Sequence, residues 1–334
     1  MADQTTADIL GAVTIRPPFD PELAPVEEAV RGLMGPLSDA TLPAHRRFMA
    51  EGVPGVEPAD LTAGGRVRVE ERHVPGPDGA PDITLLILSP VENRGPKAGI
   101  YHIHGGGMVS GDRRSGVDVA LPYVAEGSAV VVSVEYRLAP EHPDPAPVED
   151  CYAGLVWTAK NAVELGIDPE RLLVMGGSAG GGLAAGTALL ARDRAFPKLS
   201  HQVLICPMLD DRFETHSSRM LEGEGGWNRG HTLYGWTSLL GERRGGPDVS
   251  PYAAPARAED LSGLPRTYID TGSVEPFRDE ILTYARRLSE AGVSVDLHMW
   301  GGGFHGFDQV ATHAAISQAS NATRDEFVRR ALEL

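Results

Sequence analysis

The sequence predicts an α/β fold in which a mostly parallel central sheet of about eight strands is flanked by helices. Short, continuous apolar runs indicate strands that are buried on both faces, as the strands of parallel sheets are. Stretches with helical character lie between several of these runs, and such alternation is typical of α/β proteins. The 334 residues, 42% of them apolar, suffice for one large domain with a smaller attached unit.

Eight segments have strand character. The first alternates between apolar and polar residues with a period of two, and most of the later ones are unbroken apolar runs. In chain order, the predicted strands cover residues 66–70, 82–88, 98–103, 129–134, 172–175, 202–205, 267–270 and 293–297.

Helices are expected at 147–165, 178–192, 280–291 and 308–334. Two segments do not fit the alternation. Residues 1–60 show patchy helical periodicity and no good strand, and residues 208–248 form a long, aromatic-containing insertion between two strands. Long insertions in compact domains are often functional lids, and we interpret 208–248 in this way.

Ser178 lies in a glycine-rich turn where a predicted buried strand meets a helix. The pattern G-x-S-x-G can place a serine on a sharp strand-to-helix turn, and Gly176 and Gly180 remove Cβ atoms that would collide across it. The turn exposes the hydroxyl and directs the Ala179 N–H to the same place, at a helix N-terminus. A phosphate-binding loop is disfavoured, because no G-K-S/T follows.

A second glycine-rich segment, His104-Gly105-Gly106-Gly107, follows the predicted strand at 98–103. Glycines without side chains let a loop turn its backbone N–H groups inward, where they can bind the oxyanion of a tetrahedral intermediate. The two segments together predict acyl transfer at a serine.

A nucleophilic serine needs a base, and the base needs an acid that orients it. His305 is the predicted base, since it lies between glycines in a loop after the last strand. Two acids follow the strand at 267–270. Glu275 is favoured because it is nearer to the strand end, and Asp279 is the alternative.

These motifs resemble those of the bacterial carboxylesterases in the hormone-sensitive-lipase-like branch (family IV) of the α/β-hydrolases. The resemblance covers residues 70–330 and rests on HGGG at 104–107, EYRLAPE at 135–141, GGSAGG at 176–181, FRDE at 277–280 and FHGF at 304–307. Two positions depart from the family pattern: Gly177 stands where Asp is common, and Glu275 stands where the acid is usually Asp.

The resemblance implies that backbone N–H groups of Gly106, Gly107 and Ala179 form the oxyanion hole, while His104 shapes the loop. It also implies a cap made from residues 1–60 and 208–248, on a catalytic domain of residues 61–207 and 249–334. Esters with short to medium acyl chains and a homodimer through the edge strand at 293–297 are expected on the same basis. The predicted pocket walls are Met108, Leu209, Phe213, Trp227 and Phe304.

Composition narrows the remaining choices. The net charge of −16 argues against nucleic-acid partners and against stable association with anionic membranes. No run is apolar enough to span a membrane, no signal peptide is evident, and two cysteines make no disulfide framework, so we expect a cytoplasmic protein. No C-x-x-C or H-E-x-x-H spacing is present, and we expect neither a metal nor an organic cofactor.

The prediction is therefore a serine carboxylesterase that acts on a small-molecule ester through an acyl-enzyme. Two other functions remain open on the same scaffold. One is an acyltransferase that uses the same three residues with an alcohol acceptor, and the other is a ligand-binding protein without catalysis.

Overall fold

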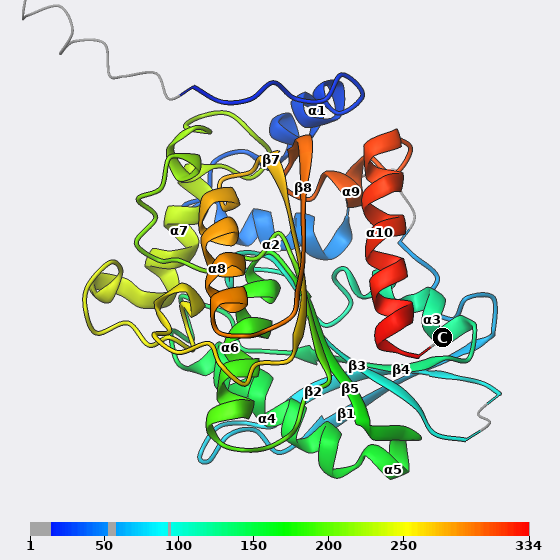
Figure 1. Cartoon of the computed structure of the whole chain (residues 1–334). Helices are drawn as coiled ribbons and strands as arrows, with labels where there is room; N and C mark the ends of the chain where they lie inside the picture. The colour runs from blue at the N-terminus through cyan, green and yellow to red at the C-terminus, as the bar shows by residue number, and fades with distance from the viewer. Residues whose placement is uncertain (1–14, 53–57, 93–94, 334) are drawn as a thin grey trace, which may run out of the picture.

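The computed structural model describes residues 15–52, 58–92 and 95–333, and these residues form one eight-stranded sheet with helices on both faces (Figure 1). The strand order is β1-β2-β4-β3-β5-β6-β7-β8. β2 is antiparallel to both β1 and β4, and the strands from β3 to β8 are parallel to one another. The predicted fold class is confirmed, and each of the eight predicted strands corresponds to an observed one.

The strands are generally longer than the apolar runs that predicted them. Their bounds are β1 Val67–Val74, β2 Ile83–Pro90, β3 Lys97–Ile103, β4 Ala129–Glu135, β5 Ile167–Gly177, β6 His201–Ile205, β7 Arg266–Val274 and β8 Val295–Phe304. Central strands are buried along nearly their whole length, as β4 illustrates, in which only Glu135 is not fully buried. Because these strands are buried on both faces, continuous apolar runs in the sequence predict them correctly.

The helices depart from the prediction in two places. The segment predicted as one helix at 147–165 contains two helices, and the segment at 308–334 is divided by a turn at 311–314. The α-helices are α1 Ala24–Met34, α2 Leu42–Glu51, α3 Leu121–Ala125, α4 Ala146–Lys160, α5 Ala162–Leu165, α6 Ala179–Asp193, α7 Arg229–Leu240, α8 Arg278–Glu290, α9 Phe307–Val310 and α10 Ala315–Ala331. Short 3-10 helices lie at Val117–Ala120, Ser217–Arg219, Gly241–Arg243 and Pro255–Arg257.

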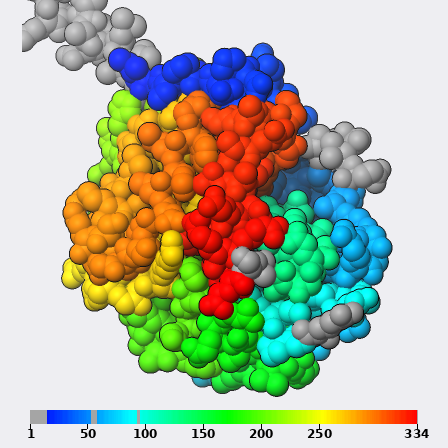
Figure 2. All heavy atoms as spheres, turned by 45° about the vertical axis from the view of Figure 1, so that its right-hand side comes forward, coloured from blue at the N-terminus to red at the C-terminus, as the bar shows by residue number. Residues whose placement is uncertain are grey.

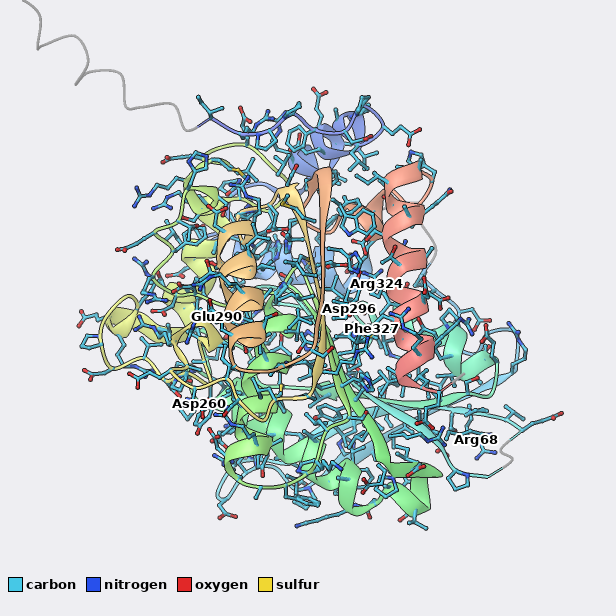
Figure 3. The ribbon with its side chains drawn as sticks, in the orientation of Figure 1. Arg68, Asp260, Glu290, Asp296, Arg324 and Phe327 are labelled. Carbon is cyan, nitrogen blue, oxygen red and sulfur yellow. The ribbon has the colours of Figure 1, made fainter. Side chains whose placement is uncertain are left out.

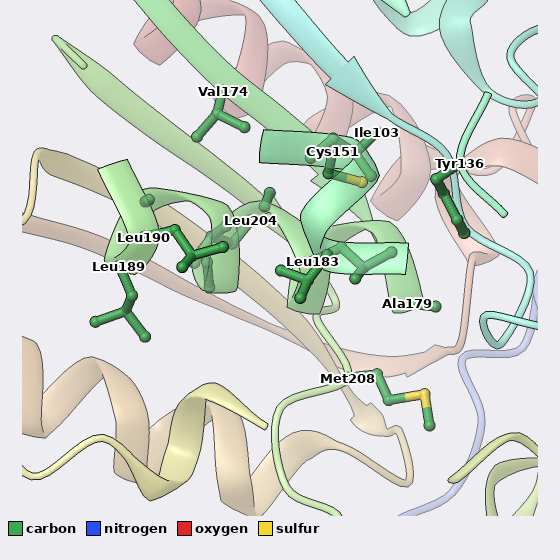
Figure 4. Packing of buried hydrophobic residues seen from close by; sticks show 14 of the residues in the cluster. Ile103, Tyr136, Cys151, Val174, Ala179, Leu183, Leu189, Leu190, Leu204 and Met208 are labelled. Atoms are coloured by element: carbon green, nitrogen blue, oxygen red, sulfur yellow. The ribbon is translucent and has the colours of Figure 1, made fainter. Parts of the chain in front are cut away.

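Helix α6 is the most deeply buried helix and packs directly on the sheet. Its residues from Ala179 to Ala191 are all buried, and Leu183 lies among side chains of the central strands and the following loop (Figure 4). A Cβ atom on Gly182 would lie 2.0 Å from the carbonyl oxygen of Met208, so only glycine permits this approach. The tight packing fixes the start of α6, and with it the turn that precedes the helix.

Helices α8 and α10 cover opposite faces of the β7–β8 end of the sheet (Figure 1). The N-terminal segment with α1 crosses the top of the molecule, where β7 and β8 end (Figure 1), and its atoms lie on those of the C-terminal segments (Figure 2). The top is therefore the edge of the sheet where the parallel strands have their carboxyl ends and where the loops that follow them begin.

The N-terminal segment that carries α1 and α2 contacts the insertion at 208–248 directly. The His231 ring lies 2.6 Å from the Gly35 carbonyl oxygen, Tyr234 donates to Asp39 at 3.0 Å, and Arg16 pairs with Glu224 at 2.7 Å. Residues 1–14 and 53–57 of the predicted cap lie outside the described residues. Within the described ranges, no helix combines the length and apolar character needed to cross a membrane.

Candidate active site

Ser178 occupies the sharp turn between β5 and α6, as the sequence predicts. Its φ of 58° and ψ of −125° lie in a region that residues with a side chain rarely adopt. A Cβ atom on Gly176 would lie 2.2 Å from the Gly180 carbonyl oxygen, and one on Gly180 would lie 2.1 Å from the Ile103 carbonyl oxygen. Both positions therefore require glycine. A side chain at Gly180 would collide with the end of β3, and not with Gly176 as the sequence suggested.

His305 and Glu275 approach Ser178 from the ends of the last two strands. His305 follows β8 and Glu275 follows β7. The Nε2 atom of His305 lies 2.8 Å from Ser178 Oγ, and its Nδ1 atom lies 2.8 Å from Glu275 Oε2. The hydroxyl, the imidazole and the carboxylate thus form one hydrogen-bonded series.

The other carboxylate oxygen of Glu275 is also held. Glu275 Oε1 accepts a hydrogen bond from the backbone N–H of Phe277 at 3.2 Å, and the side chain is completely buried. Burial opposes protonation of His305, but its interactions with Glu275 and Cys206 together outweigh this effect, so the pKa of His305 lies well above its ordinary value.

Asp279 does not join this series. Its Oδ2 atom accepts from the backbone N–H of Ser217 at 2.8 Å, and its Oδ1 atom accepts from the Arg278 guanidinium at 2.8 Å. The structure thus places Glu275, and not Asp279, against His305.

Two aromatic rings enclose the imidazole of His305. Phe277 meets it edge-on with ring centroids 5.3 Å apart, and Trp227 lies at 6.0 Å. Trp227 comes from the 208–248 insertion, and its ring fills the space where a Cβ atom of Gly107 would stand, 2.6 Å from the nearest ring carbon. The insertion therefore contributes directly to the surroundings of His305.

The glycine-rich loop after β3 is held by His104. Its Nδ1–H donates to the Gly105 carbonyl oxygen at 2.8 Å, and its ring stacks on Tyr136 at 4.1 Å. Burial lowers the pKa of His104, which keeps this ring neutral. Gly106 and Gly107 have φ values of 107° and 64°, which favour glycine.

Several backbone N–H groups in this region have no protein acceptor, and the three predicted for the oxyanion are among them. Among the described residues, the N–H groups of Gly106, Gly107 and Ala179 donate no hydrogen bond to the protein. Ala179 is the first residue of α6, where N–H groups are unpaired by the geometry of a helix start. The three donors predicted for the oxyanion are thus free to serve a ligand.

A cavity of about 290 Å³ opens beside Ser178 and His305. Its walls combine the glycine-rich turns, the residues after β6 and β8, and the inner faces of the two N-terminal helices. The apolar residues from these helices are Val30, Leu33, Met34, Phe48 and Met49. These five residues were not among the predicted pocket walls, although the spacing of Val30, Leu33 and Met34 on α1 is that of one helix face.

Of the five predicted pocket residues, only Trp227 lines this cavity. Met108, Leu209, Phe213 and Phe304 do not line it, and all four are buried in the hydrophobic core. Met108 directly follows the glycine loop, but its φ of 63° marks a reversal of the chain, and its carbonyl accepts from Ala139 at 2.9 Å. Proximity in sequence did not imply exposure to the cavity.

Behind His305, a buried charge cluster joins the loop to α10. Arg324 lies between α10 and the sheet (Figure 3), 2.8 Å from an Asp308 oxygen and 3.7 Å from an Asp270 oxygen. Burial raises the pKa of Asp270 to about 6, and Tyr268 donates to the same carboxylate at 2.8 Å. The cluster ties the segment that follows His305 to the body of the protein.

Cys206 also lies at the site, although no motif in the sequence marks it. It follows β6 with a φ of 37° and lines the cavity together with His305. In the described part of the chain, Cys206, Glu275 and His305 form the one group of potential metal ligands, with one ligand atom of each within 4.8 Å of the others.

Comparison with known proteins places this geometry in context. A family model described as "alpha/beta hydrolase fold" matches residues 100–309. Carboxylesterase NlhH of Mycobacterium tuberculosis is 37% identical over 269 residues, which cover 77% of this chain and 80% of that protein. An arylesterase of Saccharolobus solfataricus is 33% identical, covering 78% of this chain and 81% of that protein.

Solved structures give the same picture. The structure titled "Bacterial Heroin Esterase" superposes with a TM-score of 0.85 at 41% identity, over 94% of this chain and 98% of that one. Esterase LipW of Mycobacterium marinum superposes with a TM-score of 0.78 at 32% identity, over 96% of this chain and 99% of that one.

Proposed function

The chain belongs to the alpha/beta hydrolase family, in its hormone-sensitive-lipase-like branch of carboxylic ester hydrolases, and from this premise we propose that it is a serine carboxylesterase. The observation that carries the proposal is the hydrogen-bonded series from Ser178 through His305 to Glu275 beside an accessible cavity. It is an arrangement that activates a hydroxyl for attack on a carbonyl.

In the first half of the reaction, the Ser178 hydroxyl attacks the ester carbonyl while His305 Nε2 takes its proton. Glu275 accepts the Nδ1–H bond, which keeps Nε2 free to act as the base and stabilises the imidazolium that forms. His305 then gives the proton to the departing alkoxide oxygen, and an acyl-Ser178 ester remains.

In the second half, water enters and His305 takes one of its protons. The resulting hydroxide equivalent attacks the acyl carbonyl, Ser178 recovers its proton, and the carboxylic acid leaves. Negative charge develops on the carbonyl oxygen in both halves. The unpaired N–H groups of Gly106, Gly107 and Ala179 are the donors that would bind it, and one such donor contributes roughly 10²–10³ in rate.

The cavity supports an ester with an apolar part of moderate size. Side chains of α1 and α2, with Trp227, provide apolar walls, and about 290 Å³ suits a short to medium acyl chain. Because the segment that joins α1 and α2 contacts the 208–248 insertion, and because α1, α2 and Trp227 share this lining, we infer a common cap over the catalytic unit of residues 61–207 and 249–334.

One further expectation, a homodimer, belongs to this proposal. β8 is an edge strand of the sheet, with Leu297 and Met299 exposed on it, which supports a homodimer through that edge. Size-exclusion chromatography with light scattering would measure it directly.

The test of the function is hydrolysis of p-nitrophenyl acetate, butyrate, octanoate and palmitate by the purified protein and by Ser178→Ala. We expect turnover of the shorter esters and a loss of several orders of magnitude in the variant. Equal, negligible rates for both proteins would refute the esterase. If product formation instead requires an added alcohol and yields its ester, the acyltransferase replaces it.

A further inference from the structure

The thiol of Cys206 lies next to the proposed catalytic residues but takes no part in the mechanism. Its side chain is only 8% exposed, and that surface faces the cavity that also reaches His305. The second cysteine, Cys151, is completely buried in the core and lines no cavity near the site. The two cysteines thus form a natural pair of test and control positions.

Cys206, Glu275 and His305 come from three successive loops at the carboxyl ends of β6, β7 and β8. They offer a sulfur, a carboxylate oxygen and an imidazole nitrogen, all within 4.8 Å of one another. These are the three ligand types that proteins use for Zn²⁺. Because the three ligands lie far apart in the sequence, at 206, 275 and 305, they form no short sequence motif by which a metal site could be predicted.

The geometry of the three atoms is close to that of a tetrahedral site. Zn–S and Zn–N or Zn–O bonds of about 2.3 and 2.0–2.2 Å put neighbouring ligand atoms about 3.3–3.7 Å apart. The His305–Glu275 pair, now 2.8 Å apart, would open by roughly 0.5 Å, and Cys206 would approach by at most about 1 Å. Such shifts are within the reach of side-chain rotation.

We propose that Cys206, His305 and Glu275 form an inhibitory site for a thiophilic divalent cation, for which Zn²⁺ is the physiological candidate. The ion enters through the cavity, since Cys206 and His305 both line it, and a water molecule completes its coordination. Two anionic ligands, the carboxylate and the thiolate, balance the charge of the dication in this buried place.

Binding would stop the reaction for a simple reason. His305 held by the cation can no longer accept the Ser178 proton, and Glu275 can no longer orient the ring. The thiol proton is released to solvent on binding, so affinity must rise with pH.

The binding test uses Cd²⁺, whose bond to a thiolate gives an ultraviolet charge-transfer band. The full-length protein, freed of metal with a chelator, is titrated with Cd²⁺ alongside Cys206→Ala and Cys151→Ala. We expect the band to saturate at one ion per chain in the native protein and in Cys151→Ala, and to be absent in Cys206→Ala. No band in the native protein, or an equal band in Cys206→Ala, overturns the proposal. Cys206→Ser replaces Cys206→Ala if the latter does not fold.

This binding measurement does not depend on the proposed function, so its failure and that of the esterase are distinguishable. Inhibition is measured separately, with each protein compared to its own metal-free rate on p-nitrophenyl butyrate. We expect Zn²⁺ to inhibit the native protein reversibly, with relief by a chelator, and the inhibition constant to rise at least about 10-fold in Cys206→Ala. Equal inhibition of both proteins would locate the effective ion elsewhere and refute the site.

Discussion

Replacing Glu275 with Gln changes one charge at the base without changing the size of the side chain. Oε1 of Glu275 accepts from the Phe277 N–H, and Oε2 accepts from His305 Nδ1. In the variant, the amide oxygen is expected to keep the Phe277 contact, so the amide NH₂ faces Nδ1. Two donors cannot face each other, and His305 must therefore carry its proton on Nε2. That tautomer cannot accept the Ser178 proton.

The size of the effect follows from the charge that is lost. Opposite unit charges about 3–4 Å apart, in a medium of effective dielectric near 20, interact by about 4–6 kcal/mol. Each 1.4 kcal/mol is a factor of about 10 in rate, so kcat should fall by about 10³–10⁴. KM should change little, because Glu275 is completely buried and does not line the cavity.

The assay is steady-state hydrolysis of p-nitrophenyl butyrate by Glu275→Gln, with Asp279→Asn as the matched control. Asp279 is bonded to Ser217 and Arg278, and its loss should reduce stability by about 1 kcal/mol while leaving kcat within a few-fold. A decrease of less than 10-fold in Glu275→Gln would refute the assigned role. A larger decrease in Asp279→Asn than in Glu275→Gln would transfer that role to Asp279.

Other expected outcomes concern the base, the cavity and the core. Because Glu275 raises the pKa of His305 and the base must be neutral, kcat/KM should increase with pH with an apparent pKa above 6.5. A rise in kcat/KM with an apparent pKa at or below 6.5 would contradict this. Gly177→Val should reduce kcat/KM for octanoate at least about 10-fold more than for acetate, because Gly177 lines the cavity and a Cβ atom there would meet its nearest neighbours at an ordinary contact distance of 3.9 Å. Gly301→Val, at an open position that does not line the cavity, should not have this effect. Asp150→Ala should lower the free energy of unfolding by about 2–4 kcal/mol in urea, since the completely buried carboxylate accepts three hydrogen bonds from Arg137.

The sequence predicts the fold and the loops of the site because both depend on local chemistry. A buried parallel strand must be apolar along its length, so β3 to β6 are visible as runs of residues. Ser178 needs glycines at fixed offsets, and His305 needs to follow a strand, so each is visible within a few residues. The carboxyl ends of parallel strands share one edge of the sheet, which is why residues from β5, β7 and β8 meet there.

The cavity walls could not be predicted in the same way, because they depend on tertiary packing. Phe48 and Met49 on α2 reach the cavity only because Arg46 anchors that helix to the Val109 and Ala139 carbonyls and to Glu141. Phe213 has the same aromatic character as Trp227 and lies in the same insertion, yet it is buried elsewhere. Residue type alone does not distinguish a wall of a cavity from the core of a cap.

The strained backbone of Ser178 is tolerated because its neighbours leave the residue no other conformation. Its N–H donates to the Ile205 carbonyl at 2.8 Å, and its own carbonyl accepts from Gly182 and Met208 at 3.1 and 3.0 Å. A residue at such dihedral angles costs about 1–3 kcal/mol, and these three hydrogen bonds, together with the burial of helix α6, offset that cost. All of these contacts are made by backbone atoms, so the hydroxyl contributes nothing to holding the turn. The backbone therefore fixes the position of Oγ before any substrate is present, and the hydroxyl is left free to bond to His305 alone.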